Sequence, residues 1–254
     1  MEKIVALVSD YGLKDHYVGT VHAVIKDVDP EIQIVDITHN VRPFDIVDGA
    51  VKLKWSYKYF PLGTVFLALV DPDPSAEPII VSTERYFVVC PNNGIVSLMA
   101  EEEPVESVYL ITADHYFLEG KGNFRGRNQF APIAAELSRL QNPSHFGEKI
   151  EKNRLRLFKL PPNVRVSDNV VETIVLDIDS FGNLILNLSV DEAVKSVEIN
   201  GRKVEKFLNS FSEAQKGELF ISVNPEGYLQ IVAYMANAAA LLGVKRGQKV
   251  RVEF

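Results

Sequence analysis

The chain has 254 residues, of which 46% are hydrophobic, and carries a formal net charge of -7. This length suits one large domain or two ordinary ones, and the apolar content is enough to form a buried core. The negative charge and the scattered Lys and Arg residues argue against nucleic acid as the main partner, because phosphate binding needs a basic stripe.

The sequence shows no sign of an internal disulfide, a membrane span or a signal peptide. The single cysteine, Cys90, cannot form an internal disulfide, and it lies inside an apolar run, so covalent catalysis has no obvious nucleophile. No apolar run approaches the roughly 18 residues that a membrane span requires. The N-terminus leads directly into a short strand rather than into the apolar core of a signal peptide. We therefore expect a soluble cytoplasmic protein with no membrane partner.

The first part of the chain alternates predicted strands with predicted helices. The apolar run that begins at Ile4 closes on Ser9 and Asp10, as expected for a buried strand that carries a carboxylate to its carboxyl end. Alternation implies parallel pairing with right-handed crossovers, and hence an α/β domain with a mainly parallel sheet. The helices are expected over Lys14–Asp27, Asp45–Tyr59 and Gln129–Leu140, and the further strands over Ile32–Ile37, Thr64–Val70, Ile79–Ser82 and Tyr86–Cys90.

The last part of the chain has a different pattern of predicted secondary structure. The pair Pro161 and Pro162 marks a linker, and beyond it short β-rich runs are separated by turn signals such as Asn200-Gly201. A short Ala-rich helix is expected over Met235–Leu242. We predict an N-terminal α/β domain over 1–156 and a C-terminal β-barrel-like domain over 165–254.

Aspartates stand at the ends of three predicted strands. Asp10, Asp71 and Asp179 each follow an apolar run, and ligands bind at the carboxyl edge of open α/β sheets. If these ends converge, they form an acidic pocket for a polar ligand with some positive charge. An acid pair for a ribose diol, an amide at Asn183 and a ring at Phe181 suit a nucleoside.

Two other interpretations of the aspartates stay open on residue chemistry alone. Asp10, Asp71 and Asp73 are also able to hold magnesium for phosphoester hydrolysis, although no second acidic or histidine cluster has recognisable ligand spacing. Loop aspartates also often only cap turns and helices. His22, at helical spacing after the first strand, is interpreted as a packed or surface histidine rather than as a ligand, and no metal site is predicted.

A set of short motifs follows a fixed order along the chain: Ser9–Asp15, Tyr17–Gly19, Arg42–Asp45, Val70–Pro72, Pro91–Gly94, Phe124–Arg127, Phe130–Pro132, Asp179–Asn183 and Asn237–Ala239. This order resembles that of the S-adenosyl-L-methionine (SAM) hydroxide adenosyltransferases, which are related to the SAM-dependent fluorinase and chlorinase. The resemblance implies an N-terminal α/β domain, a C-terminal β-barrel domain and a homotrimer with sites between subunits.

The resemblance also implies roles for individual residues. Asp10 is expected to bind the ribose hydroxyls, and Phe44 to lie beside the ligand. Asp179 is expected to hold the methionine amine, and Asn183 to read the adenine edge. The remaining substrate-binding candidates are Phe181 and Phe211, which stack on the base, the backbone at Ala236, and Asn93 in the Asn-Gly turn.

The implied reaction is attack of water or hydroxide on ribose C5′ of SAM, which releases adenosine and L-methionine without a cofactor. Asp71 and Arg125 are the catalytic candidates. Arg125 stands where hydrolases of this family have a histidine, and no arginine follows Asp71 before Ile79. The alternative is therefore a catalytically weak or inactive adenosine- or SAM-binding protein on the same fold.

Overall fold

The computed structural model describes residues 2–70, 75–119, 123–190 and 194–254. The chain divides into two compact units, Met1–Lys159 and Leu160–Phe254. The boundary, between Lys159 and Leu160, lies one residue before the Pro161–Pro162 pair. Within the described residues, no helix is both long enough and apolar enough to cross a membrane.

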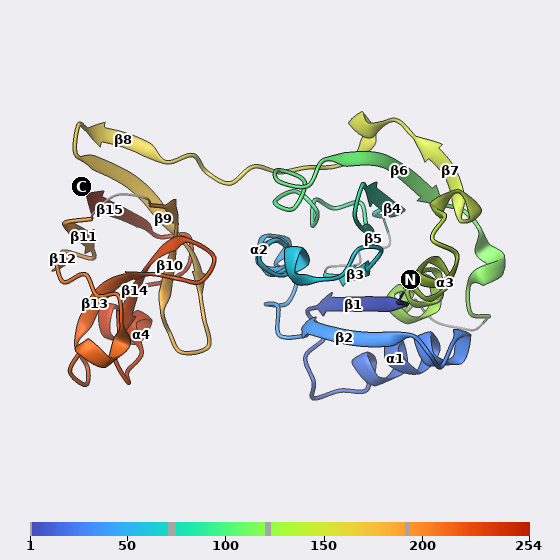
Figure 1. Ribbon diagram of the computed structural model, residues 1–254, viewed down its shortest axis with the longest axis horizontal. Helices are drawn as coiled ribbons and strands as arrows, with labels where there is room; N and C mark the ends of the chain where they lie inside the picture. Colours follow the sequence, from blue (N-terminus) through green and yellow to red (C-terminus); the bar gives the residue numbers. More distant parts are fainter. Residues whose placement is uncertain (1, 71–74, 120–122, 191–193) are drawn as a thin grey trace. The chain divides into compact units, whose positions relative to one another are not determined.

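The N-terminal unit is built on one seven-stranded sheet with the order β2-β1-β3-β5-β4-β6-β7 (Figure 1). Its strands are β1 (Ile4–Ser9), β2 (Gln33–Thr38), β3 (Val65–Leu69), β4 (Pro78–Thr83), β5 (Phe87–Pro91), β6 (Val105–Ile111) and β7 (Gly147–Ile150). Its helices are α1 (Tyr17–Val28), α2 (Ile46–Ser56) and α3 (Ala131–Leu140). Short helical turns lie at η1 (Tyr57–Tyr59), η2 (Asp114–Tyr116), η3 (Gly126–Phe130), η4 (Pro143–His145) and η5 (Lys152–Arg154).

The sheet confirms the α/β class, but its pairing is mixed. The neighbours β2-β1-β3-β5 pair in parallel, as the alternation of strands and helices predicts. Antiparallel pairing joins β5 to β4, β4 to β6 and β6 to β7. For β4 and β5 the physical reason is the tight turn between Thr83 and Tyr86, whose backbone groups bond to each other, because a connection so short allows only an antiparallel hairpin.

Alternate residues of β1 face two different helical layers, as a strand period of two requires. Ala6 and Val8 lie in the core that contains Leu53 of α2. Val5 and Leu7 lie in the other core, together with side chains of α1 and α3. Both faces of β1 are therefore buried, which explains its unbroken apolar sequence.

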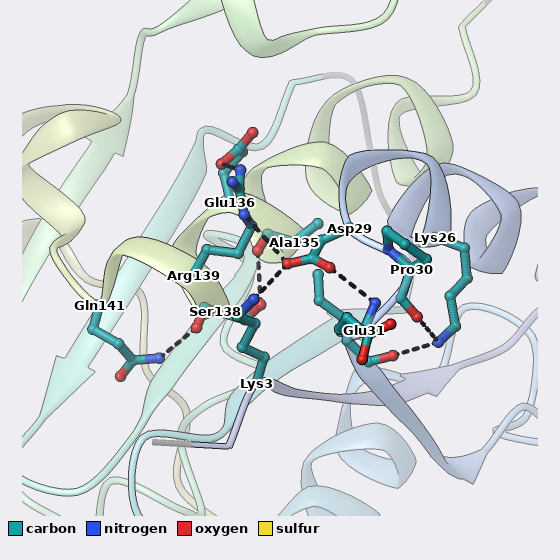
Figure 2. Close-up of polar contacts among 11 residues, drawn as sticks. Lys3, Lys26, Asp29, Pro30, Glu31, Ala135, Glu136, Ser138, Arg139 and Gln141 are labelled. Carbon is teal, nitrogen blue, oxygen red and sulfur yellow. Dashed lines mark hydrogen bonds and ion pairs between the residues drawn. The ribbon is translucent and has the colours of Figure 1, made fainter.

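A polar network around Asp29 ties the start of β1 to α1 and α3. The Asp29 carboxylate accepts a hydrogen bond from Lys3 Nζ at 2.7 Å and lies 3.4 Å from Arg139 Nε, as Figure 2 shows. The hydrogen bond from Lys3, followed by one from the Glu31 backbone, lowers the pKa of Asp29. This network stabilises the edge of the unit at neutral pH.

The C-terminal unit is an antiparallel sheet of eight strands. The order is β12-β11-β15-β9-β10-β14-β13, with β8 paired to β9, and contact between β12 and β13 gives the sheet its barrel-like form. The strands are β8 (Val164–Ser167), β9 (Val170–Ile178), β10 (Leu184–Ser189), β11 (Ser196–Ile199), β12 (Arg202–Val204), β13 (Leu219–Val223), β14 (Tyr228–Ala233) and β15 (Lys249–Glu253). The turn η6 (Phe211–Glu213) and helix α4 (Ala238–Leu242) complete this unit, which confirms the predicted barrel-like class.

Candidate functional site

The carboxyl end of β1 presents Asp10 and holds Phe44 in a specific backbone conformation. Asp10 Oδ2 accepts a hydrogen bond from the Phe44 N–H at 2.8 Å. Phe44 has a φ of 65°, a region that bulky residues rarely adopt, and its side chain is 74% exposed. Asp45, the next residue, caps α2 by accepting a hydrogen bond from the Asp48 N–H. Asp10 Oδ1 makes no hydrogen bond within the described residues, so it is open to a ligand donor.

Tyr11 lies next to Asp10 and was not singled out from the sequence. Its hydroxyl is buried with no hydrogen-bond partner in the part of the chain that the structure describes. Burial, and then the charge of Asp10, raise the pKa of Tyr11, so its hydroxyl keeps its proton at any working pH. A Cβ atom added at Gly126 would collide with this hydroxyl, which explains the glycine there.

Asn93 organises the turn that follows β5. Its Nδ2 donates to the Val70 carbonyl at 2.9 Å, and its Oδ1 accepts from the Ile95 N–H at 3.1 Å. The side chain therefore links this turn to the end of β3. Asn93 therefore shapes the backbone at the end of β3, and its role in substrate binding stays a prediction.

Arg125 is held in place by several contacts at the start of a π-helical turn. Its Nη2 donates to the Ala76 carbonyl at 3.0 Å, its Nε donates to Gln129 Oε1 at 2.9 Å, and the guanidinium lies 5.2 Å from the centre of the Phe130 ring. Residues Gly126–Phe130 form the π-helix η3, which precedes α3. Such turns often occur at functional sites. The other catalytic candidate, Asp71, and the alternative metal ligand Asp73 lie outside the described residues.

A pocket of about 450 Å³ lies in the C-terminal unit, a size within the usual range for small-molecule sites. Two aromatic rings, Phe181 and Phe211, line it together with the buried amide of Asn183, which is 7% exposed. Phe181, in the turn after β9, is 75% exposed. The pocket is completed by Val232, Ala233, Tyr234, Met235 and Ala236.

The turn between β9 and β10 is organised by Asp179. Its Oδ1 accepts from the backbone N–H groups of Phe181 and Asn183, both at 2.9 Å, and its Oδ2 accepts from Asn183 Nδ2 at 2.8 Å. Gly182 has a φ of 86°, and a Cβ atom there would collide with the side chain of Asn237. These contacts orient the Asn183 amide, whose Oδ1 makes no hydrogen bond within the described residues.

The structure thus gathers the predicted residues into two groups. Phe181, Asn183, Phe211 and Ala236 line one pocket, and Asp179 supports it from the adjoining turn. The remaining candidates lie in the N-terminal unit, with Asp10 bonded to Phe44, and with Asn93 and Arg125 bonded to the backbone on either side of residues 71–74. Tyr234 and Met235 of the pocket were not predicted, and no motif of the sequence marks them.

These features define a protein with an α/β unit and a barrel-like unit whose pocket is lined by aromatic rings and an amide. The chain belongs to the SAM hydroxide adenosyltransferase family. The family's N-terminal domain matches residues 5–147, and its C-terminal domain matches residues 173–251.

Relatives of known name match nearly the whole chain. A protein of Methanocaldococcus jannaschii named (R)-S-adenosyl-L-methionine hydrolase is 30% identical over 95% of this chain and 92% of its own length. A protein of the same name from Thermus thermophilus is 31% identical over 98% of each chain. A fluorinase of an Actinoplanes species is 24% identical over 98% of this chain and 97% of its own.

Solved structures of similar fold also cover the whole chain. An uncharacterized conserved protein from Thermotoga maritima has a TM-score of 0.90 at 30% identity, over 99% of this chain and 100% of its own. A conserved hypothetical protein from Thermus thermophilus has a TM-score of 0.80 at 30% identity, over the same shares. The similarity therefore extends through both units.

Proposed function

We propose that this protein hydrolyses SAM to adenosine and L-methionine, with water attacking ribose C5′. The observation that carries the proposal is its similarity to four proteins named (R)-S-adenosyl-L-methionine hydrolase, at 28–31% identity over nearly the full chain. The pocket in the C-terminal unit supports it, because two rings and a buried amide suit a purine base. The name of these relatives specifies the R form, so both sulfonium epimers belong in the assay.

The proposed ligand contacts use groups with open hydrogen-bonding capacity. The adenine ring stacks on Phe181 and Phe211, and the Oδ1 of Asn183 accepts from the base edge. Asp10 accepts from the ribose hydroxyls through Oδ1, while its Oδ2 holds the Phe44 backbone. Asp179 binds the methionine amine by charge, in addition to its contacts within the turn.

The reaction step is a displacement at carbon. An oxygen–C5′ bond forms, the C5′–sulfur bond breaks, and its electron pair converts the cationic sulfonium into the neutral thioether of methionine. Because the sulfonium is already a good leaving group, no general acid is required. The protein must align the water with C5′ and exclude other nucleophiles.

The attacking water loses a proton, and Arg125 is unable to take it because a guanidinium stays protonated. We propose that Arg125, held by the Ala76 carbonyl and by Gln129, stabilises developing hydroxide. Asp71 or solvent then accepts the proton. With no histidine in this role, the rate should show no inflection near the histidine pKa of about 6.5.

We further propose that the protein is a cytoplasmic homotrimer with its sites between subunits. The reaction itself uses no cofactor. The predicted ligand residues lie in two separate units of the chain, so complete binding requires groups from both. Light scattering should give a mass of three times 28.4 kDa. A monomer that binds adenosine with full affinity would contradict the shared site.

The test is incubation of the purified protein with each SAM epimer, followed by chromatography for adenosine and methionine. Equal amounts of the two products support hydrolysis. The presence of Arg125 at the family's histidine position favours the one alternative, a SAM- or adenosine-binding protein with little turnover. Saturable adenosine binding without product formation would establish that alternative.

A further inference from the structure

Three side chains of the N-terminal unit meet beside the carboxyl ends of β1 and β2. His22 projects from α1, Asp36 lies in β2, and His39 follows directly after β2. Asp36 Oδ1 lies 2.9 Å from His22 Nε2 and 3.0 Å from His39 Nε2. One atom from each of the three residues lies within 4.8 Å of the others.

His39 has an unexplained nitrogen at this cluster. The residue is only 4% exposed, and its Nε2 has no hydrogen-bond partner among the described residues. Its contact with Asp36 is close but does not have hydrogen-bond geometry. An unpaired buried nitrogen costs free energy, so a partner beyond the described residues would stabilise it.

The other nitrogen of the same ring is already engaged. His39 Nδ1 lies 2.7 Å from Ser9 Oγ, and Ser9 is buried. When Nδ1 carries the proton and donates it to Ser9, the lone pair of Nε2 points into the cluster. A hydrogen bond of this kind at the second nitrogen is typical of histidines that ligate metals, because it sets the tautomer and the orientation of the ring.

We propose that His22, Asp36 and His39 bind one divalent transition-metal ion of the zinc class. The ligand atoms are the two Nε2 atoms and Asp36 Oδ1, with water at a fourth position. Bonds of about 2.0–2.1 Å in a tetrahedral site place ligand atoms about 3.3 Å apart. The present separations from Asp36 Oδ1, 2.9 and 3.0 Å, need to widen by a few tenths of an ångström. One ligand atom from each residue lies within 4.8 Å of the others, so the two histidine nitrogens need to come to the same spacing of about 3.3 Å on binding.

The donor set decides the class of ion. Two imidazoles and one carboxylate suit zinc and its first-row neighbours, whereas calcium and magnesium prefer oxygen ligands throughout. His22 and Asp36 are both partly exposed, so an ion reaches the cluster from solvent. When bound, the ion joins α1 to β2 next to Ser9, one residue before Asp10. It is separate from the proposed SAM chemistry, which needs no metal.

The test uses the tag-free, chelator-treated full chain titrated with zinc chloride by calorimetry, and with cobalt(II) followed by visible absorption. One ion per chain and the spectrum of four-coordinate cobalt are expected. His22→Ala and Asp36→Asn should each weaken zinc binding by at least about 10-fold, since each removes a ligand. The control His115→Ala changes an exposed histidine outside the cluster and should bind as the parent does.

A second readout separates binding from folding. Zinc should raise the thermal unfolding temperature of the parent and of His115→Ala but not that of His22→Ala, because only a ligand of the folded state stabilises it. Absence of stoichiometric zinc binding would overturn the proposal. Equal zinc affinity in His22→Ala, Asp36→Asn and the parent would also overturn it, and would leave the three residues as a simple His-Asp-His ion-pair cluster.

Discussion

Replacing Phe181 by alanine tests the pocket of the C-terminal unit with little risk to the fold. The ring is 75% exposed, so its removal leaves no buried cavity and the stability of the protein should hardly change. If the adenine base stacks on this ring, the loss is about 1–3 kcal/mol of binding free energy. The dissociation constant of Phe181→Ala for adenosine should therefore be about 5- to 150-fold higher than that of the parent.

The assay is calorimetric titration of adenosine into the parent, Phe181→Ala and the control Phe207→Ala. Phe207 is a partly exposed phenylalanine of the same unit that does not line the pocket. The control should bind adenosine as the parent does. Equal affinity in Phe181→Ala and the parent, with unchanged unfolding temperatures, would refute the assignment of this pocket to the base.

Three further predictions concern Asn183, Asp71 and Asp29. Asn183→Ala should cost about 1–3 kcal/mol of adenosine affinity through lost buried hydrogen bonds, measured by the same titration, and unchanged affinity in a folded variant would remove Asn183 from the site. Asp71→Asn should abolish most SAM turnover while adenosine binding stays nearly intact; turnover at the parent rate would show that Asp71 takes no part in the chemistry. Asp29→Asn should lower the unfolding temperature at pH 7, because the pKa of Asp29 is lowered by its hydrogen bond from Lys3. The stability from a lowered carboxyl pKa is present above the unfolded value of about 3.9 and is lost as the pH falls through the folded value. The parent and Asp29→Asn should therefore converge in acid, and a constant difference down to about pH 2 would contradict this reasoning.

The parts of the fold that depend on local patterns were predictable. The apolar run before Asp10 predicts a buried strand because β1 is covered on both faces, and the Asn200-Gly201 turn predicts the hairpin of β11 and β12. The antiparallel pairing of β4 with β6 and of β6 with β7 was not predicted. These strands lie far apart in sequence, so their pairing depends on long-range contacts that local patterns do not reveal.

Near the candidate sites, the structure also differs from the sequence-based predictions where contacts distant in sequence determine the local conformation. The helix expected from Gln129 begins instead with a π-turn at Gly126, where a side chain would collide with the Tyr11 hydroxyl. The helix expected from Met235 begins at Ala238, because Met235 adopts a φ of 52° that no helix contains. The meeting of His22 with Asp36 and His39 depends on how α1 crosses the sheet, and no sequence spacing encodes it.

The most direct test of the account is hydrolysis of SAM by the purified protein in water enriched in oxygen-18, with mass spectrometry of both products. Attack of water on C5′ predicts adenosine that carries the heavy oxygen at its 5′ hydroxyl, together with an equal amount of unlabelled methionine. Unlabelled adenosine, or no adenosine at all from protein saturated with either SAM epimer, would contradict the proposed function.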